Sequence, residues 1–174
     1  TSAHVNELGV RVPTVFIHNR AAEVLPHSIY HDDLNATRAM TRHLLDLGHR
    51  RIAFGGNERG GLLHQQRREG VIAELKSAGL ELQREYDLLV PNGQMSSGAL
   101  LAIQLLDMPK RPTAIICFND MQAIGVMQTL QQANVRIPED ISVAGFDDIP
   151  LAEFIYPALT TYCQPIWELG QMAA

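Results

Sequence analysis

A short apolar run at residues 141–146, ISVAGF, is entered through Pro138 and left through Asp147 and Asp148. The run has the length of a strand and is apolar on both faces, which is typical of a parallel strand covered by helices on each side. Both carboxylates would then lie at the carboxyl end of the strand, where ligands bind in open α/β sheets. Asp147 is therefore the first candidate for a ligand contact. The alternative is that one of the two Asp residues only caps the following turn.

Short apolar runs of this kind alternate with segments of helical periodicity along the chain. Strands are predicted at 13–17, 28–30, 51–56, 87–90, 113–118 and 141–146, and helices at 35–47, 62–78, 96–106 and 121–133, with one helix ending within 3–10 and another beginning at Pro165. About five such alternations predict an α/β fold with a doubly wound parallel sheet of the flavodoxin-like type and right-handed crossovers. Gly70, inside the helix at 62–78, costs about 1 kcal/mol relative to Ala and indicates close packing there.

The composition limits the possible partners. The chain has 174 residues, a net charge of −5 and 46% hydrophobic residues, so it has no general attraction to nucleic-acid phosphates. No stretch approaches the roughly 20 apolar residues of a membrane span, and the first residues lack the pattern of a signal peptide. Two cysteines far apart in sequence, Cys117 and Cys163, predict buried thiols and a reducing, cytoplasmic location.

Polar side chains gather where the predicted strands and their following loops end. The clusters are Asp32 with Asp33, Arg67 with Arg68, Asn119 with Asp120, and Asp147 with Asp148. Because the loops after parallel strands share one rim of a doubly wound sheet, these groups can converge on one polyol. Adjacent sugar hydroxyls both donate and accept, so one Asp or one Arg can bind two of them. The pattern predicts a binding site rather than a catalytic site.

The run ISVAGFDD followed by PALTT resembles the signature of the lactose-repressor and galactose-repressor family of bacterial transcription regulators, and HLLDLGHRRI at 43–52 is similar to a helix end of that family. The resemblance implies the effector-binding core, whose fold is like that of the type I periplasmic sugar-binding proteins. Residues 1–28 would then be the end of the N-terminal lobe, 29–161 the C-terminal lobe, and 162–174 the return helix to the first lobe. A DNA-binding helix-turn-helix headpiece would be absent from this chain, which looks cut at both ends.

The same resemblance implies the residues that bind the effector. They are Asp32, Arg67, Asn119 and Asp147, with Asn35, Phe118 and Phe146 as further candidate contacts and Asp33 as a neighbour of Asp32. The family often has an aromatic residue five positions before the glycine of the fourth helix, but here the residue five before Gly98 is Gly93. A platform for a sugar ring would have to come from Phe118, Phe146 or Tyr30, although aromatic residues at strand ends more often fill the core.

The function implied by the resemblance is that of an effector-sensing core. A small sugar or related metabolite would bind between the lobes and change operator binding by the headpieces of a homodimer. No catalytic residue, cofactor, metal ion or membrane contact is expected. Substituting Arg67 or Asp147 by Ala is expected to weaken effector binding without unfolding the domain.

Other functions fit the residues less well. A periplasmic sugar-binding protein of a transporter would share the fold and the polar cleft. An enzyme such as a sugar-phosphate hydrolase would need a nucleophile, base or metal set that the sequence does not show. His27, His31, Asp32 and Asp33 lack the spacing of a metal site, and the glycine-rich residues 55–61 lack the motif of a phosphate-binding loop.

Overall fold

The computed structural model of the chain describes residues 14–17 and 27–174. The chain divides into two compact units, one of residues 1–32 and 164–174 and the other of residues 33–163. In the first unit, β1 (Phe16–Ile17) and β2 (Ser28–Ile29) pair in parallel, and both contact α6 (Ile166–Ala173). The helix expected to end within residues 3–10 lies outside the described residues, and the assignment of the units to two lobes stays a prediction.

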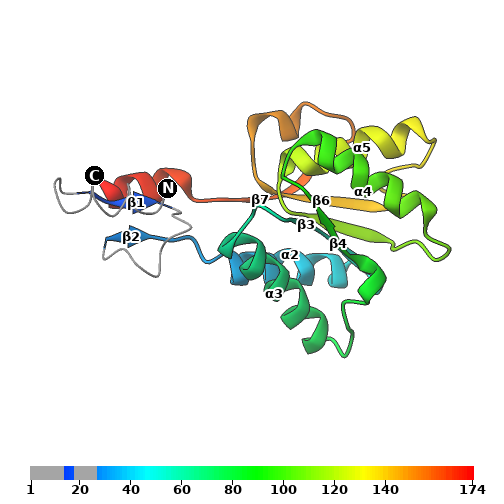
Figure 1. Cartoon of the computed structure of the whole chain (residues 1–174), viewed down its shortest axis with the longest axis horizontal. Coiled ribbons are helices and arrows are strands. Elements are labelled where there is room, and N and C mark those ends of the chain that lie inside the picture. Colours follow the sequence, from blue (N-terminus) through cyan, green and yellow to red (C-terminus); the bar gives the residue numbers. More distant parts are fainter. Residues whose placement is uncertain (1–13, 18–26) are drawn as a thin grey trace. The chain divides into compact units, whose positions relative to one another are not determined.

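The second unit alternates strands and helices, as Figure 1 shows. Its elements are α2 (Asp33–Asp46), β3 (Ile52–Asn57), α3 (Leu62–Ser77), η2 (Arg84–Tyr86), β4 (Asp87–Val90), α4 (Met95–Asp107), β5 (Ala114–Cys117), α5 (Asp120–Gln132), β6 (Ser142–Asp147), η3 (Pro150–Glu153) and β7 (Thr160–Cys163). Each strand and helix predicted in this unit is present, with bounds that shift by one or two residues.

The five strands form one sheet in the order β4-β3-β5-β6-β7, and every neighbouring pair is parallel. This confirms the predicted α/β class and its doubly wound sheet. From β3 the chain first adds β4 on one side and then β5, β6 and β7 on the other. The connections after β3 and β5 therefore diverge, and this reversal leaves the crevice where open α/β sheets bind ligands.

Helices cover both faces of the sheet, and its inner strands β3, β5 and β6 are apolar along most of their length, whereas the edge strand β7 contains Thr160 and Thr161. Along β3, Ile52 and Phe54 belong to one apolar cluster, formed with α2 and α3, while Ala53 belongs to the cluster formed with α4 and α5. Residues of β5 alternate in the same way between the two clusters. All of β3 and β5 is buried, as expected for parallel strands between two helical layers.

Glycines allow the helices in each layer to approach closely. A Cβ added at Gly70 of α3 would collide with the carbonyl oxygen of Leu34, and one added at Gly125 of α5 would collide with that of Met95. The close packing expected at Gly70 is therefore confirmed. The prediction for the cysteines is half right, because Cys117 is buried within β5 but Cys163 is exposed at the end of the edge strand β7.

In the part of the chain that the structure describes, no helix is both long and apolar enough to cross a membrane.

Candidate functional site

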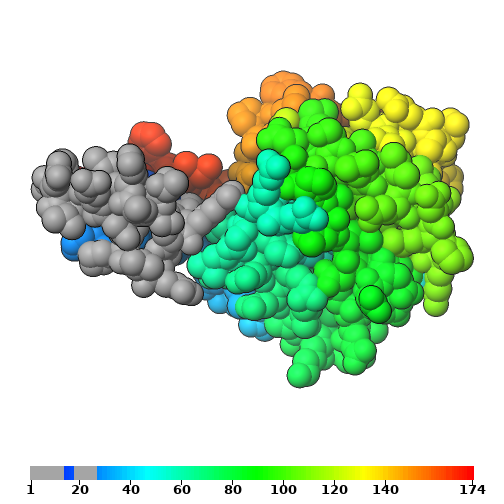
Figure 2. Space-filling view, viewed as in Figure 1, coloured from blue at the N-terminus to red at the C-terminus, as the bar shows by residue number. Residues whose placement is uncertain are grey.

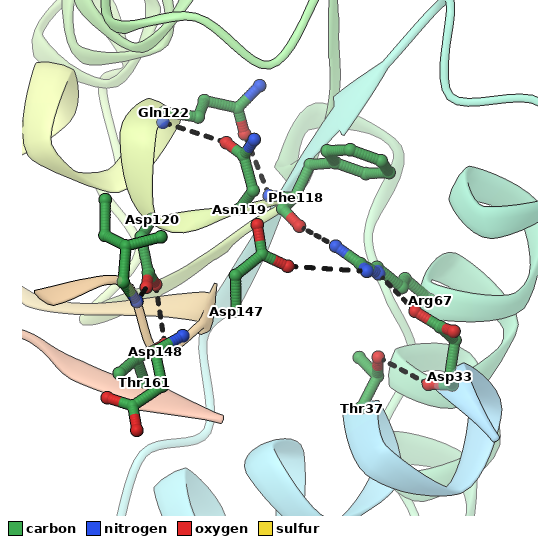
Figure 3. Close-up of polar contacts among 11 residues, drawn as sticks. Asp33, Thr37, Arg67, Phe118, Asn119, Asp120, Gln122, Asp147, Asp148 and Thr161 are labelled. Atoms are coloured by element: carbon green, nitrogen blue, oxygen red, sulfur yellow. Dashed lines mark hydrogen bonds and ion pairs between the residues drawn. The ribbon is translucent and has the colours of Figure 1, made fainter. Parts of the chain in front are cut away.

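Arg67 lies at the centre of the polar rim, and its side chain is only 4% exposed. Its side chain points from α3 toward Phe118 and Asp147, at the carboxyl ends of β5 and β6 (Figure 3). Its Nε donates to Asp33 Oδ1 at 2.6 Å, and its Nη1 donates to the carbonyl oxygen of Phe118. Since Asp33 is fully buried, the two side chains form an ion pair shielded from water. Such a pair fixes the guanidinium plane.

Two aromatic rings pack against the same guanidinium group. The Arg67 guanidinium carbon lies 3.8 Å from the ring centroid of Phe146 and 4.6 Å from that of Phe118. Phe146 also stacks on Tyr162 of β7, with ring centroids 5.1 Å apart. Phe146 is 1% exposed and Phe118 is 7% exposed, so both rings serve mainly as packing around the cation.

Asp147 is the last residue of β6 and the most accessible charge of this group. One carboxylate oxygen lies 3.7 Å from Arg67 Nη2, and 28% of the side chain is exposed. That separation is longer than a hydrogen bond, so Arg67 supplies electrostatic support while the carboxylate can still reach a ligand. The backbone of Asp147 has φ 119° and that of Asp148 has φ 58°, and residues other than glycine rarely adopt either value.

Asn119 caps α5, because its side-chain oxygen accepts from the backbone N–H of Gln122 at 2.9 Å. A Cβ added at the buried Gly93 would lie 2.7 Å from Asn119 Nδ2. The glycine found where the family often has an aromatic residue therefore makes room for the Asn119 amide, which occupies this part of the rim.

Gln122 is a residue of the rim that the sequence did not reveal. It is fully buried; its Oε1 accepts from the N–H of Phe118 at 2.9 Å, and its Nε2 donates to the carbonyl of Gly56 at 3.1 Å. It thus ties the end of β5 to the end of β3. The one available signal was a glutamine in the first turn of an apolar helix.

The loop between β3 and α3 packs against the same rim. Burial and the nearby Arg68 lower the pKa of His64, so its ring is neutral near pH 7 and Nδ1 can accept from the N–H of Asn57 at 3.3 Å. A Cβ added at Gly60 would lie 3.0 Å from the Phe118 ring. The glycines of this loop allow a tight turn over Phe118.

The structure brings four of the predicted residues, Arg67, Phe118, Phe146 and Asp147, into one cluster. Figure 3 shows Asn119 next to Phe118 and close to Arg67 and Asp147. Asp33, the neighbour of the predicted Asp32, pairs with Arg67, whereas Asp32 is exposed and belongs to the first unit, so its expected contact with the effector stays a prediction.

Asn35 is exposed and accepts from Arg38 Nη1 at 3.4 Å, so the structure does not bring it into the cluster. Within residues 14–17 and 27–174, no three His, Cys, Asp or Glu side chains are placed to hold a metal ion.

Comparisons with known proteins agree with this architecture. Residues 41–174 match the family described as periplasmic binding protein-like domain. The repressor PurR of Vibrio vulnificus is 40% identical over 76% of the chain, and the repressor CytR of Escherichia coli is 33% identical over 92%. A solved LacI-family regulator from Enterococcus faecium with bound ribose has a TM-score of 0.75 and 34% identity, and the match covers 84% of this chain and 54% of that one.

The chain belongs to the periplasmic binding protein-like domain family, and within it to the LacI-family transcription regulators. It spans 40% of the length of the PurR relative and 47% of the CytR relative. Both relatives are repressors of transcription, which favours the regulator over the transporter protein and over the enzyme considered from the sequence.

Proposed function

We propose that this chain is the effector-sensing core of a transcription repressor and that a small sugar or related polar metabolite binds at the rim formed by Arg67, Asn119 and Asp147. The observation that carries the proposal is the Asp147 carboxylate, partly exposed at the end of β6 and held against a buried cation. A carboxylate so placed can accept from two adjacent hydroxyls, and the amide of Asn119 can donate to a third.

The charges at this rim favour a neutral ligand. The carboxylates of Asp33 and Asp147 outnumber the guanidinium of Arg67, which already donates to Asp33 and to Phe118. The negative charge of a phosphate group at this rim would be repelled by the Asp147 carboxylate, and the Arg67 guanidinium is already fixed by its hydrogen bonds to Asp33 and Phe118. Neutral sugars and nucleosides should therefore bind better than their phosphorylated forms.

The bound effector would act by favouring one conformation of the protein. It can change DNA binding only if its affinity differs between two conformations, because equal affinity shifts nothing. Operator DNA would be bound by a helix-turn-helix headpiece outside this chain, as the HTH-type names of the relatives suggest. A repressor working on DNA in this way would be cytoplasmic.

The test is a thermal-shift and calorimetric screen of the chain with ribose, other neutral sugars, nucleosides, purines and sugar phosphates. A ligand at about 100 times its dissociation constant should stabilise the folded state by about 2.7 kcal/mol. Asp147→Asn should weaken the binding of the hit by tenfold or more, since a charge-assisted hydrogen bond contributes roughly 1.5 to 3 kcal/mol. Asp148→Asn is the matched control, because Asp148 is exposed and its side chain points away from Arg67 (Figure 3).

We also propose that the chain associates as a homodimer through the segment that follows β6. Leu151 is 44% exposed, Phe154 81% and Tyr156 91%, and this segment lies at the surface (orange in Figure 2). Leu151 and Tyr156 also line a groove of about 360 Å³ against Met127 of α5. Large apolar side chains gathered at a groove are typical of a protein–protein contact, and a second copy of the chain is the partner expected for a regulator of this family.

A further inference from the structure

Asp120, the first residue of α5, has a fully buried carboxylate that the effector site described above does not use. Its Oδ1 accepts from the hydroxyl of Thr161 on β7 at 2.6 Å, and its Oδ2 accepts from the backbone N–H of Ile149 at 2.9 Å. Both bonds lead to the segment that follows β6, as Figure 3 shows. One buried side chain therefore joins α5, β7 and the turn after Asp147.

The turn at residues 147–149 needs such a support. Asp147 and Asp148 both have positive φ, 119° and 58°, and each such residue raises the energy of the backbone by roughly 1 to 3 kcal/mol. The N–H of Asp148 donates to the hydroxyl of Thr161 at 3.3 Å, and the N–H of Ile149 donates to Asp120. The hydroxyl of Thr161 thus accepts from the turn and donates to Asp120, so that both amides after Asp147 are held by one pair of side chains.

The strand that leads to the turn is shaped to admit the carboxylate. A Cβ added at Gly145 would collide with Asp120 Oδ1 and would lie 2.9 Å from Leu159. Burial raises the pKa of Asp120, although the bonds from Thr161 and from backbone amides favour its charged form. Burial therefore opposes the charged form of Asp120, and the structural role of this buried carboxylate is its hydrogen bonds to Ile149 and Thr161.

We propose that Asp120 is a positioning residue that holds the 147–149 turn in its left-handed conformation and so presents the Asp147 carboxylate beside Arg67 for the effector. Asp120 does not touch the effector in this arrangement. The inference rests on the proposed function in one respect, namely that Asp147 contacts the effector.

The first test needs no ligand. Amide hydrogen exchange is measured by NMR in the chain and in its Asp120→Ala and Thr161→Val variants. In Asp120→Ala, we expect the amides of Asp148 and Ile149 to exchange at least tenfold faster. In Thr161→Val, we expect the same increase for the amide of Asp148. The amides of β5 should keep their protection in both variants. Thr41→Val, which removes another buried hydroxyl in α2, is the control and should leave Asp148 and Ile149 unchanged. Unchanged exchange of both amides in the Thr161 and Asp120 variants would overturn the inference, and the Thr161 variant decides alone if Asp120→Ala does not fold.

The second test separates positioning from general support of the fold. Ribose affinity is measured by calorimetry for the chain, Asp120→Ala, Asp147→Asn and the double variant. If Asp120 acts through Asp147, each single change weakens binding by tenfold or more and the double variant binds no more weakly than Asp147→Asn. Additive losses would contradict the inference. If the unaltered chain does not bind ribose, ribose is excluded as its effector. The role of Asp120 is then decided by the hydrogen-exchange measurement alone.

Discussion

Arg67 and Asp33 set the energetics of the rim at the scale of single residues. Both side chains are buried, and each satisfies the other's charge. Removing one partner leaves an uncompensated buried charge, which typically costs about 3 to 5 kcal/mol. The structure therefore changes the expectation from the sequence that Arg67→Ala weakens effector binding while the domain remains folded.

We expect Arg67→Ala to lower the free energy of unfolding by about 3 to 5 kcal/mol, measured by urea denaturation at pH 7. Asp147→Asn is the matched control, because Asp147 is 28% exposed and lies 3.7 Å from the same guanidinium. Its free energy of unfolding should change by about 1 kcal/mol at most. Equal effects of the two substitutions would contradict the central role of the buried pair.

Site residues that directly follow a strand could be predicted from the sequence, but those whose orientation depends on where a helix begins could not. Asp147 and Asn119 follow directly from apolar runs, so the sequence places them at strand ends. The sequence named Asp32 and could not show that Asp33 is the residue beside Arg67, because α2 begins at Asp33 rather than at the predicted Asn35. That shift turns Asp33 inward to Arg67 and leaves Asp32 exposed. Gln122 was missed because its bonds run to backbone groups of other elements.

Glu74 links the two helices on one face of the sheet at the scale of elements. Its side chain on α3 is 3% exposed and binds Arg38 and Arg42 of α2. Burial alone would raise the pKa of Glu74, but the hydrogen bonds from Arg42 and Arg38 lower it below the ordinary value. A folded-state pKa below the unfolded one gives a stabilisation that is present above the unfolded pKa and is lost as the pH falls through the folded pKa.

Glu74→Gln should accordingly lower the free energy of unfolding at pH 7, by about 1 to 3 kcal/mol. The difference from the unaltered chain should shrink as the pH falls below the ordinary pKa of a glutamate, because Glu74 takes up a proton first in the unfolded chain and only at lower pH in the folded chain, where its pKa is lowered. Denaturation at a series of pH values provides the measurement, with Glu81→Gln at an exposed position as the control. A difference that does not change with pH would show that the ion pairs to α2 do not stabilise the fold.

The packing of α4 against α5 gives a second prediction at this scale. A Cβ at Gly125 would collide with the backbone of Met95, whereas one at Gly170 in α6 would meet no atom of the described residues within 4 Å. In an open helix, Gly→Ala gains about 1 kcal/mol, but overpacking costs about 1 to 3 kcal/mol. We expect Gly125→Ala to lower the midpoint of thermal unfolding and Gly170→Ala not to lower it. A higher midpoint for Gly125→Ala would mean that the two helices separate easily.

The order of strands is the part of the architecture that alternation alone leaves open. The runs at 51–56 and 113–118 predict buried strands but do not say that β3 and β5 are neighbours. The structure supplies that order, because Phe54 of β3 pairs with Ile116 of β5. Close approaches such as those at Gly93 and Gly145 depend on side chains from distant segments, so no local pattern predicts them.

Under the proposed function the whole molecule would act as a dimer, because two headpieces would have to be spaced for one operator. The exposed rings of Phe154 and Tyr156 are the part of the proposed contact surface that a partner can bury most completely. The main chain of Tyr156 is held in place independently, since its carbonyl accepts from Gln131 Nε2 at 2.7 Å. Substituting the two side chains should therefore change association without changing the local fold.

Sedimentation velocity of the chain should show a dimer, and the Phe154→Ser/Tyr156→Ser variant should sediment as a monomer with unchanged circular dichroism. Leu47→Ser is the control, because Leu47 is 64% exposed on the loop after α2 and lies outside the proposed surface. Loss of two buried aromatic side chains from each copy removes several kcal/mol of binding free energy. That loss raises the dissociation constant by a hundredfold or more. A monomeric unaltered chain, or a variant that remains dimeric at micromolar concentration, would place the contact between copies elsewhere on the molecule.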